Sequence, residues 1–447
     1  MDPKSGMDPK SGMDPKSGMD PKSGIDRRGV LKGMAGLAAG SAVGAFPMPA
    51  LAQNTPLKVG IIAPRAGTAA YIGANGLRAV EWSTEKINAS GGIAGRKVEL
   101  VVEEETNAKE TLERARRLVL QEKVDCIQGG YSTGVTLPMA PTLEDMQVLT
   151  IFWDGTTQDG VKETMPSPKY VFKSTDNECE AVMASLIALK HLKGQFKRIA
   201  AISPDYTYGR NVWTAFKALN KKFGIDAEVV SEQWSSFSQL DFTANVAALK
   251  AAKPDLIYCV LGNADLPIFM RAATSAGLTD TARMVLVQAG HQHGQLKKPF
   301  TPVGTLLCYN TMYFARPNPS AAQKEFVEYY MDKYKDYPHW ESDRAFFAMN
   351  VYKAGVEKAM AAKGGSWPKP EEIAQAIEGI KVESFGGPAG MRKDHIAEEM
   401  FYGGFATHDN PYDVCTLKDT YSYDASVLQK PPGADFWGWL ETANFPV

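Results

Sequence analysis

The segment that decides the fold runs from Asp125 to Thr157 and reads DCIQGGYSTGVTLPMAPTLEDMQVLTIFWDGTT. Its first apolar run, at residues 124–128, is typical of a buried strand and ends at two glycines. A helical pattern follows over residues 135–146, and a second apolar run at residues 148–152 predicts another strand. This strand–helix–strand order predicts an α/β fold with both strands parallel in one sheet.

Both strands of this unit end in polar residues, and open α/β sheets bind ligands at that edge. Ser132 and Thr133 stand where a helix N-cap belongs, and free N–H groups at a helix N-terminus suit a carboxylate. We therefore expect Thr133 to contact an anionic ligand group and Asp154 to meet an amine or another donor. The local alternatives stay open here, with Thr133 as an N-cap and Asp154 as a turn former.

The same alternation of strand and helix patterns extends along the chain. It covers residues 57–152 and restarts over residues 181–288, which predicts two α/β lobes of similar design with parallel sheets and a cleft between them. Long helical patterns follow at residues 321–334 and 345–362. The tail from Phe385 is rich in glycine, proline and aromatic residues, and we expect short strands and loops there.

Composition excludes some classes of function. The 447 residues carry a formal net charge of -2, so no basic face is expected to bind nucleic acid. The five cysteines show no metal-type spacing, and their odd number leaves at least one unpaired. Cys126, Cys259 and Cys308 lie in strand-like runs, where we expect buried, inert thiols.

Two N-terminal segments precede the folded chain. Residues 1–24 repeat MDPKSG four times and are too polar to form a core, so we expect disorder. Residues 25–52 combine Arg27 and Arg28 with an apolar stretch and the cleavage pattern Ala50-Leu51-Ala52. This segment resembles a twin-arginine signal peptide and predicts a periplasmic mature protein that begins near Gln53.

Enzymatic alternatives rest on short motifs. Residues 130–134 match G-x-S-x-G, the nucleophile motif of α/β-hydrolases, with Ser132 as the nucleophile. No downstream acid or histidine stands in a telling pattern, so a secreted hydrolase is the alternative of another class. His291 and His293 could offer imidazoles to a metal, but a polar loop is the favoured interpretation. The sequence predicts no metal, no cofactor and no catalytic residue.

Aromatic residues cluster in the polar turns that follow predicted strands. Because such turns are not core, we expect these rings to wall a ligand pocket. They are Tyr71, Tyr131, Trp153, Tyr206 and Tyr208.

Three segments carry a resemblance to a known family. LKVGIIAP at residues 57–64, AYIG at 70–73 and INASGGIAGR at 87–96 resemble the opening of the branched-chain amino acid-binding proteins of ABC importers. The similarity extends over about residues 57–407. It implies a type I periplasmic binding protein, in which two Rossmann-like lobes are joined by a three-segment hinge. The implied lobes are residues 53–175 plus 310–394 and residues 176–309 plus 395–447.

The resemblance also implies ligand contacts. Tyr71, Thr133, Asp154, Thr156 and Tyr208 match family positions that face the ligand. Asn263 and Gln288 stand where the family has a tyrosine and a glutamate that meets the ligand's ammonium. Trp153 is expected to narrow the site, and Tyr131 with Asp205-Tyr206-Thr207-Tyr208 resembles the amide and urea branch.

The function implied by the resemblance is capture of a small polar or amino-acid-like molecule for an ABC importer. Amide, urea and aromatic-acid ligands remain alternatives to branched-chain amino acids. The partners are a small-molecule ligand and the permease subunits with their ATPases, and the protein is expected to be a monomer and not an enzyme.

Overall fold

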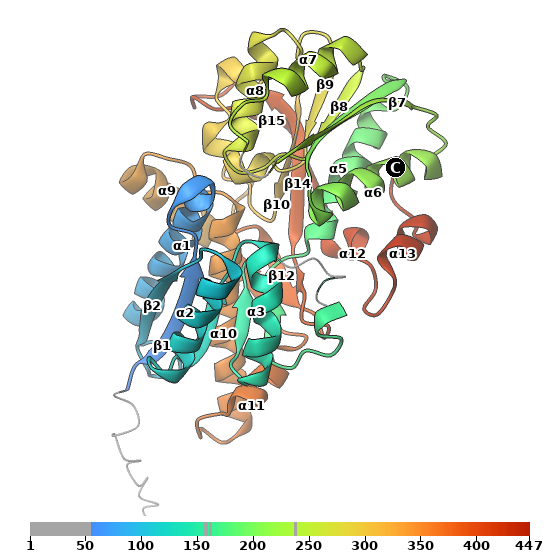
Figure 1. Ribbon diagram of the computed structural model, residues 1–447. Coiled ribbons are helices and arrows are strands. Elements are labelled where there is room, and N and C mark those ends of the chain that lie inside the picture. The colour runs from blue at the N-terminus through green and yellow to red at the C-terminus, as the bar shows by residue number, and fades with distance from the viewer. Residues whose placement is uncertain (1–54, 156–159, 161–162, 237–238) are drawn as a thin grey trace, which may run out of the picture. The chain divides into compact units, whose positions relative to one another are not determined.

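The structure is a computed structural model that describes residues 55–155, 160, 163–236 and 239–447 (Figure 1). The predicted repeat, the signal peptide and Thr156 lie outside these residues. The described part belongs to one compact unit. None of its helices is both long enough and apolar enough to cross a membrane.

The first lobe is built on a five-stranded parallel sheet in the order β2-β1-β3-β4-β5. Apolar runs with few charges form its central strands, as expected for strands that helices cover on both faces. The elements are β1 (Leu57–Ala63), η2 (Gly67–Ala69), α1 (Ala70–Ala89), β2 (Val98–Glu104), α2 (Ala108–Leu120), β3 (Cys126–Gly129), α3 (Thr133–Asp145), β4 (Thr150–Phe152) and β5 (Val171–Lys173).

The second lobe is built on a seven-stranded sheet in the order β15-β14-β10-β9-β8-β6-β7. Its elements are α5 (Asn177–Leu192), β6 (Arg198–Pro204), α6 (Thr207–Lys222), β7 (Glu228–Ser235), α7 (Thr243–Ala252), β8 (Leu256–Cys259), α8 (Asp265–Ser275), β9 (Arg283–Leu286), η3 (Ala289–Gln295), η4 (Lys298–Phe300), β10 (Leu306–Asn310), β14 (Met400–Thr407), β15 (Thr416–Asp424), α12 (Ala425–Leu428) and α13 (Phe436–Thr442).

The two sheets repeat one topology. Numbered within each lobe, the parallel strands follow the order 2-1-3-4-5, which is a doubly wound arrangement with a ligand crevice at the carboxyl ends of its strands. The predicted α/β fold class is confirmed. One detail was wrong, because β14 and β15 are long antiparallel strands that extend the second sheet, where short strands and loops were expected.

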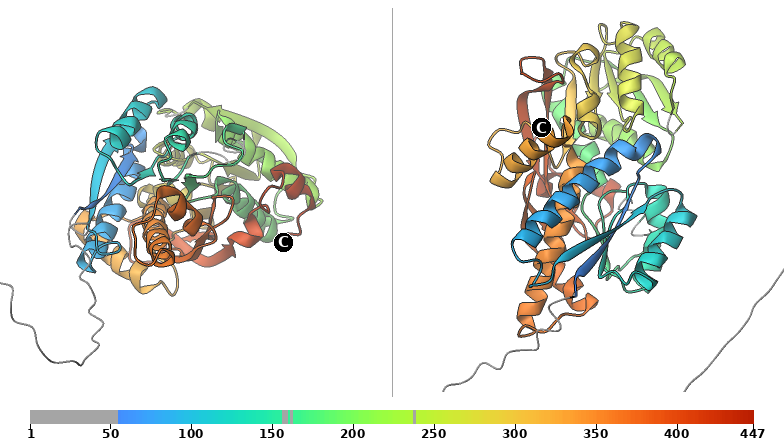
Figure 2. Two further views of the ribbon diagram at one scale, coloured as in Figure 1. Left: turned by 90° about the horizontal axis from the view of Figure 1, so that it is seen from below. Right: turned by 90° about the vertical axis from the view of Figure 1, so that its left-hand side faces the viewer.

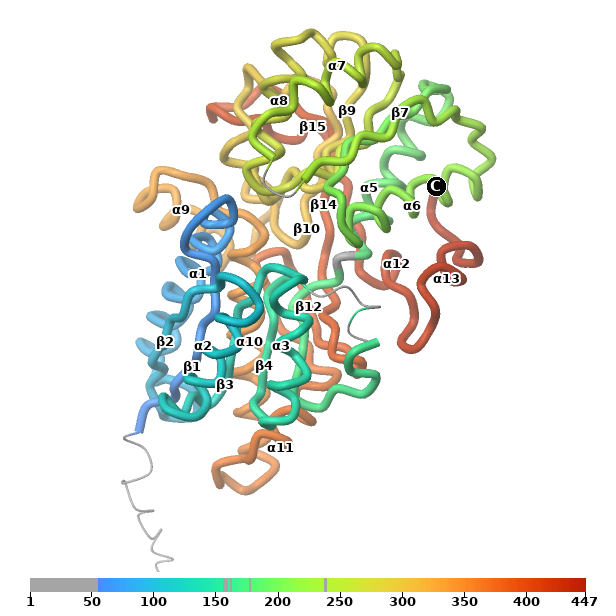
Figure 3. The backbone as a smooth tube through the Cα atoms, viewed as in Figure 1, coloured from blue at the N-terminus to red at the C-terminus, as the bar shows by residue number. Residues whose placement is uncertain are grey.

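The chain passes between the lobes three times. It leaves the first sheet after β5, returns after β10 and enters the second sheet again at β14, as the tube in Figure 3 shows. Between the last two crossings it forms α9 (Ala321–Tyr334), α10 (Trp340–Ala362), α11 (Pro370–Ile377) and a small antiparallel sheet of β11 (Lys381–Ser384), β12 (Gly387–Met391) and β13 (Ala397–Glu398). Helix α10 packs along α1 and so belongs to the first lobe (Figure 2).

All five cysteines are buried and free, which resolves the pairing that the sequence left open. The expectation of buried thiols at Cys126, Cys259 and Cys308 is confirmed.

Candidate functional site

A cavity of about 310 Å³ lies where the carboxyl ends of strands from both sheets meet. One wall comes from the turns after β3 and β4 and comprises Tyr131, Ser132, Thr133, Gly134, Asp154 and Gly155. The opposite wall comes from the second lobe and comprises Asp205, Tyr206, Tyr208, Gln288 and His291. The equal topology of the two sheets explains why both present their strand ends to one space.

The turn after β3 depends on two glycines with positive φ. Gly129 (φ 109°) and Gly130 (φ 80°) hold backbone conformations that other residues rarely adopt. A Cβ on Gly129 would lie 2.0 Å from the carbonyl oxygen of Ile62 on β1. The turn can therefore lie tightly against the neighbouring strand before α3 begins.

Glu105 occupies two backbone donors that the sequence left free. The N–H of Tyr131 donates to its Oε2 at 2.6 Å, and the N–H of Ser132 donates to its Oε1 at 2.8 Å. The expectation of free N–H groups throughout this turn was therefore wrong, because a carboxylate just beyond β2 already accepts from two of them. Burial raises the pKa of Glu105 to about 7, and the two N–H donors oppose that rise.

Ser132 and Thr133 lie at the start of α3, Ser132 as the N-cap and Thr133 as the first helical residue. Ser132 is the N-cap of α3, but its side chain makes no capping hydrogen bond, and its carbonyl oxygen accepts from the N–H groups of Val135 and Thr136. Thr133 is the first residue of the 13-residue helix and lines the cavity beside Gly134. The positive end of the helix dipole therefore faces the cavity at Thr133.

Asp154 lines the same wall, but its carboxylate is already engaged. Its Oδ1 accepts from the N–H of Gly155 at 2.7 Å, and its Oδ2 accepts from Nη1 of Arg344. Nε2 of His291 lies 3.4 Å from that Oδ2. The residue is 5% exposed, so this pairing takes place away from bulk solvent.

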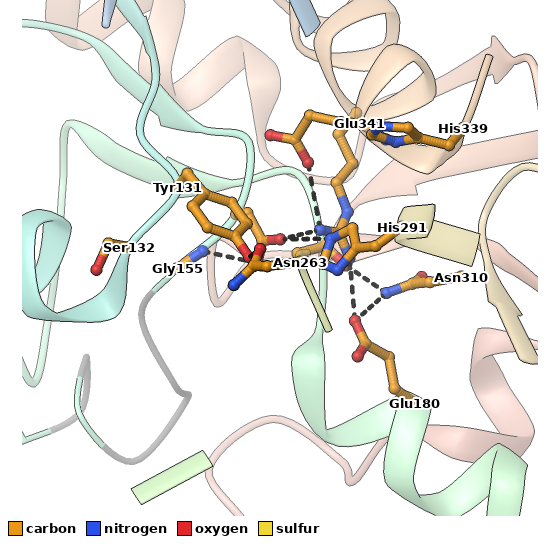
Figure 4. Close-up of polar contacts among 12 residues, drawn as sticks. Tyr131, Ser132, Gly155, Glu180, Asn263, His291, Asn310, His339 and Glu341 are labelled. Atoms are coloured by element: carbon orange, nitrogen blue, oxygen red, sulfur yellow. Dashed lines mark hydrogen bonds and ion pairs between the residues drawn. The ribbon is translucent and has the colours of Figure 1, made fainter. Parts of the chain in front are cut away.

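Arg344, near the start of α10, is the centre of a buried polar cluster. Its Nη2 donates to Thr175 Oγ1 at 3.0 Å and to Glu180 Oε1 at 3.1 Å, and its Nη1 lies 3.5 Å from Glu341 Oε2. Asn310, the last residue of β10, also donates to Glu180 Oε1. Thr175 and Asn310 lie at two of the three crossings, so the cluster joins the cavity wall to the hinge (Figure 4).

Burial changes the protonation of the groups around Arg344. It raises the pKa of Glu341 well above its ordinary value, and the nearby Asp154 raises it further. It lowers the pKa of His291 to about 4, so that imidazole is neutral at pH 7. The guanidinium is therefore the principal positive charge at this end of the cavity.

Asp154, His291 and Glu341 could in principle hold a metal ion, because their ligand atoms lie within 4.8 Å of one another. The guanidinium of Arg344 contacts both carboxylates of this set. A cation is thus already supplied by the protein, and a metal ion would have to displace it against charge repulsion. The residues present do not fit a metal centre.

The second-lobe wall is largely aromatic and neutral. The rings of Tyr206 and Tyr208 are stacked, with centroids 6.2 Å apart and an interplanar angle of 29°. The Tyr208 hydroxyl donates to Glu180 Oε2 at 2.7 Å, which connects this wall to the Arg344 cluster. Gln288 follows β9 and is 8% exposed.

Three residues expected at the site are not among the described residues that line the cavity. The Tyr71 hydroxyl donates to Asp336 at 3.3 Å, and Trp153 is a core residue of the first lobe that packs on Gly76. Asn263 accepts a hydrogen bond from the Tyr131 hydroxyl at 2.5 Å across the two lobes. Asn263 therefore contacts the lining residue Tyr131, while Tyr71 and Trp153 make their contacts with other parts of the chain.

The expectation of a polar loop at His291 and His293 was wrong. Both side chains lie in η3 and are 2% and 1% exposed, respectively. His291 packs on Trp340 with ring centroids 3.9 Å apart. A segment with two histidines and two glycines gives no apolar signal, and the rings that bury it come from other parts of the chain.

Sequence reasoning missed Glu105 and the cluster of Glu180, Glu341 and Arg344. Glu105 follows a strand at the binding edge, so the rule that led to Asp154 could have found it. Arg344 lies 190 residues from Asp154 in a helical pattern, where a solvent-exposed arginine is the ordinary expectation. No local signal distinguishes it.

Comparisons with known proteins agree with this arrangement. Residues 56–404 match the family model described as periplasmic binding protein. Leu/Ile/Val-binding protein homolog 3 from Brucella melitensis is 28% identical over 362 residues, which cover 79% of this chain and 91% of the relative.

Two solved structures share the fold. A solute-binding protein of an ABC transporter from Rhodopseudomonas palustris BisB5, in complex with 3,4-dihydroxybenzoic acid, matches with a TM-score of 0.72 and 21% sequence identity, over 83% of this chain and 98% of that one. The branched-chain amino acid transporter substrate-binding protein LivJ from Streptococcus pneumoniae, in complex with isoleucine, matches with a TM-score of 0.67 and 18% identity, over 83% of this chain and 100% of that one.

Proposed function

The chain belongs to the periplasmic binding protein family, and we propose that it captures a small polar ligand between its two lobes and delivers it to an ABC importer. The observation that carries this proposal is the cavity of about 310 Å³ that strand ends of both lobes line. A ligand that contacts both walls favours the closed arrangement of the lobes over an open one. Closure about the three crossings is a hinge motion of the kind found in this architecture.

The first lobe supplies the polar end of the proposed site. Thr133 and the N–H groups at the start of α3 offer a hydroxyl and a partial positive charge to a ligand carboxylate. Thr156, which follows Asp154 by two residues in the sequence, is proposed as a further contact. Tyr208 and Gln288 would cover the ligand from the second lobe.

The importer type is that of the branched-chain amino acid family, which the Brucella relative supports by its name. A small aromatic acid is the second candidate ligand class, because the structurally similar R. palustris protein holds a dihydroxybenzoic acid and the present cavity is lined by tyrosines. An amide or urea ligand remains the third candidate.

Location and partners follow from the same proposal. The protein would be exported, by the twin-arginine route that residues 25–52 resemble, and would act in the periplasm as a monomer. Its closed form would dock on the permease subunits of the importer, whose ATPases drive transport.

The geometry gives little support to the hydrolase alternative. Ser132 directs its backbone N–H to Glu105, and no hydrogen bond joins its hydroxyl to a histidine among the residues that the structure describes. A nucleophilic serine needs such a base within hydrogen-bond reach. We therefore propose a binding protein without covalent chemistry.

A thermal-shift screen of the purified chain tests the proposal. The panel comprises amino acids, amides, urea and aromatic acids at millimolar concentration. A true ligand stabilises the folded state by RT ln(1 + [L]/Kd), which is about 2.7 kcal/mol at a hundredfold excess over Kd. Absence of a shift with every solute would overturn the binding function, and ester hydrolysis that Ser132→Ala abolishes would favour the hydrolase in its place.

A further inference from the structure

Both carboxylates that line the cavity already accept hydrogen bonds from an arginine. Asp154 accepts from the buried Arg344, and the exposed Asp205 accepts from Nε of Arg210 at 2.9 Å. These are the only acidic residues on the described lining. Each carboxylate on this lining therefore already has an arginine as its partner when a ligand ammonium arrives.

The cation at Asp154 belongs permanently to the protein. Arg344 is fully buried, and its two terminal nitrogens contact four side chains that come from the turn after β4, the first crossing, α5 and α10. A guanidinium remains charged at any pH at which the protein is folded. An incoming ammonium would have to lie beside this fixed positive charge.

The rest of the inner wall offers neutral groups. His291 is 2% exposed, and its Nε2 lies 3.4 Å from Asp154 Oδ2. Its ring makes a T-shaped contact with the Tyr131 ring at a centroid distance of 5.9 Å. Gln288, which contributes an amide, completes this end of the cavity.

The opposite end favours an anion. Helix α3 has 13 residues and presents Thr133 and Gly134 to the cavity, and neither backbone N–H has a partner among the described hydrogen bonds. The volume of about 310 Å³ is about twice the 150 Å³ that accommodates a benzene ring, so a ring or branched chain with a carboxylate fits.

We infer that the cavity selects carboxylates without an ammonium group, because Arg344 occupies at Asp154 the place that a ligand's ammonium would take. This inference rests on the proposed function and names the ligand class of the same cavity. Arg344 is then a positioning residue for specificity, which acts through Asp154 without touching the ligand. The preferred ligands are monocarboxylates with a planar or branched apolar body.

Matched pairs of ligands test the inference on the unaltered chain. Titration calorimetry compares 3-phenylpropanoate with phenylalanine and 4-methylpentanoate with leucine, since the members of each pair differ only by the ammonium. We expect the deaminated member to bind tighter by about 10-fold or more, because an ammonium without a partner loses its hydration uncompensated.

Two variants change the preference within each pair. Arg344→Gln removes the internal cation and should shift the affinity ratio toward the amino acid by about 10-fold or more, an effect that loss of stability alone would not produce. Gln288→Glu adds a carboxylate to the opposite wall and should shift the ratio in the same direction without touching the Arg344 cluster. Arg116→Gln, at an exposed arginine of α2, should leave the ratio unchanged.

Equal or tighter binding of phenylalanine and leucine to the unaltered chain would overturn the inference and leave the proposed function standing. Binding of benzamide or urea without binding of either carboxylate would overturn it as well. If no member of the wider solute panel binds, the proposed function itself fails.

Discussion

The turns after β3 and β4 lie on one edge of one sheet and are both polar and rich in glycine, yet they differ in whether their polar side chains are already paired. The turn after β3, here the open turn, leaves Thr133 and Gly134 on the cavity lining at the start of a helix. The turn after β4, here the closed turn, places Asp154 on the same wall, but Arg344 and Gly155 already donate to its carboxylate. A polar residue at a binding edge is therefore available to a ligand only if no residue from a distant part of the chain already pairs with it.

Breaking the closed turn should have the largest effect. Arg344→Gln leaves Asp154, Glu180 and Glu341 buried without their cation, and removing one partner of a buried pair costs about 3–5 kcal/mol. Urea denaturation followed by circular dichroism measures the loss. The exposed Arg116→Gln should change stability by less than about 0.5 kcal/mol. If Arg344→Gln lost as little stability as Arg116→Gln, the cluster would not hold the lobes together.

Changing the open turn should affect binding more than folding. Thr133→Ala removes the hydroxyl proposed to meet a ligand carboxylate, and a hydrogen bond to a charged group contributes about 1.5–3 kcal/mol. Calorimetry with the tightest ligand of the screen should therefore show a loss of affinity of about 10-fold or more. An unchanged affinity would remove Thr133 from the proposed site, whatever the ligand.

The pH dependence of stability sharpens the comparison through Glu105, which accepts from two N–H groups of the open turn. Its pKa in the folded state is about 7, above its ordinary value of 4.5, so the folded state binds the proton more tightly than the unfolded state. Its contribution to stability is full below pH 4.5 and declines as pH rises toward 7, by at most about 1.4 kcal/mol per pH unit.

Glu105→Gln cannot ionise and should remove this decline. The difference in free energy of unfolding between the two proteins, measured from pH 4.5 to pH 8, isolates Glu105 from the other buried acids. Identical pH profiles would show that Glu105 ionises with its ordinary pKa.

The contact between the open turn and the second lobe should give the smallest effect. Tyr131→Phe removes the hydroxyl that donates to Asn263 at 2.5 Å while keeping the ring on the cavity wall. One neutral hydrogen bond contributes about 0.5–1.5 kcal/mol, so ligand affinity should fall by about 10-fold at most. Asn263→Ala should reduce ligand affinity by the same amount as Tyr131→Phe. A much larger loss in either variant would point to a direct ligand contact.

Local patterns predicted the fold because strands and helices of this class carry their own signals. Apolar runs located β1, β3 and β4 within two residues of their bounds, and helical spacing located α2. The antiparallel strands β14 and β15 were missed because β14 contains two adjacent glycines and β15 is mostly polar. Their pairing depends on β10, which is distant along the chain.

The site was harder to predict than the fold, because its chemistry depends on pairs of residues that are far apart in sequence. Strand-end reasoning located Tyr131, Thr133, Asp154 and Tyr208, and the structure places all four on one cavity. It could not show that Asp154 is paired, because that depends on a residue in α10. Trp153 was expected to narrow the site, yet its ring turns into the core, since alternate residues of an extended segment face opposite sides.

Isothermal titration calorimetry of the whole chain tests most directly whether the cavity binds or catalyses. Injections of 3-phenylpropanoate should give a saturable heat with one site per chain, and injections of p-nitrophenyl acetate should give no heat beyond dilution. The opposite result, with no saturable heat for the carboxylate and a continuing heat of ester hydrolysis that Ser132→Ala abolishes, would contradict the assignment of a solute-binding protein.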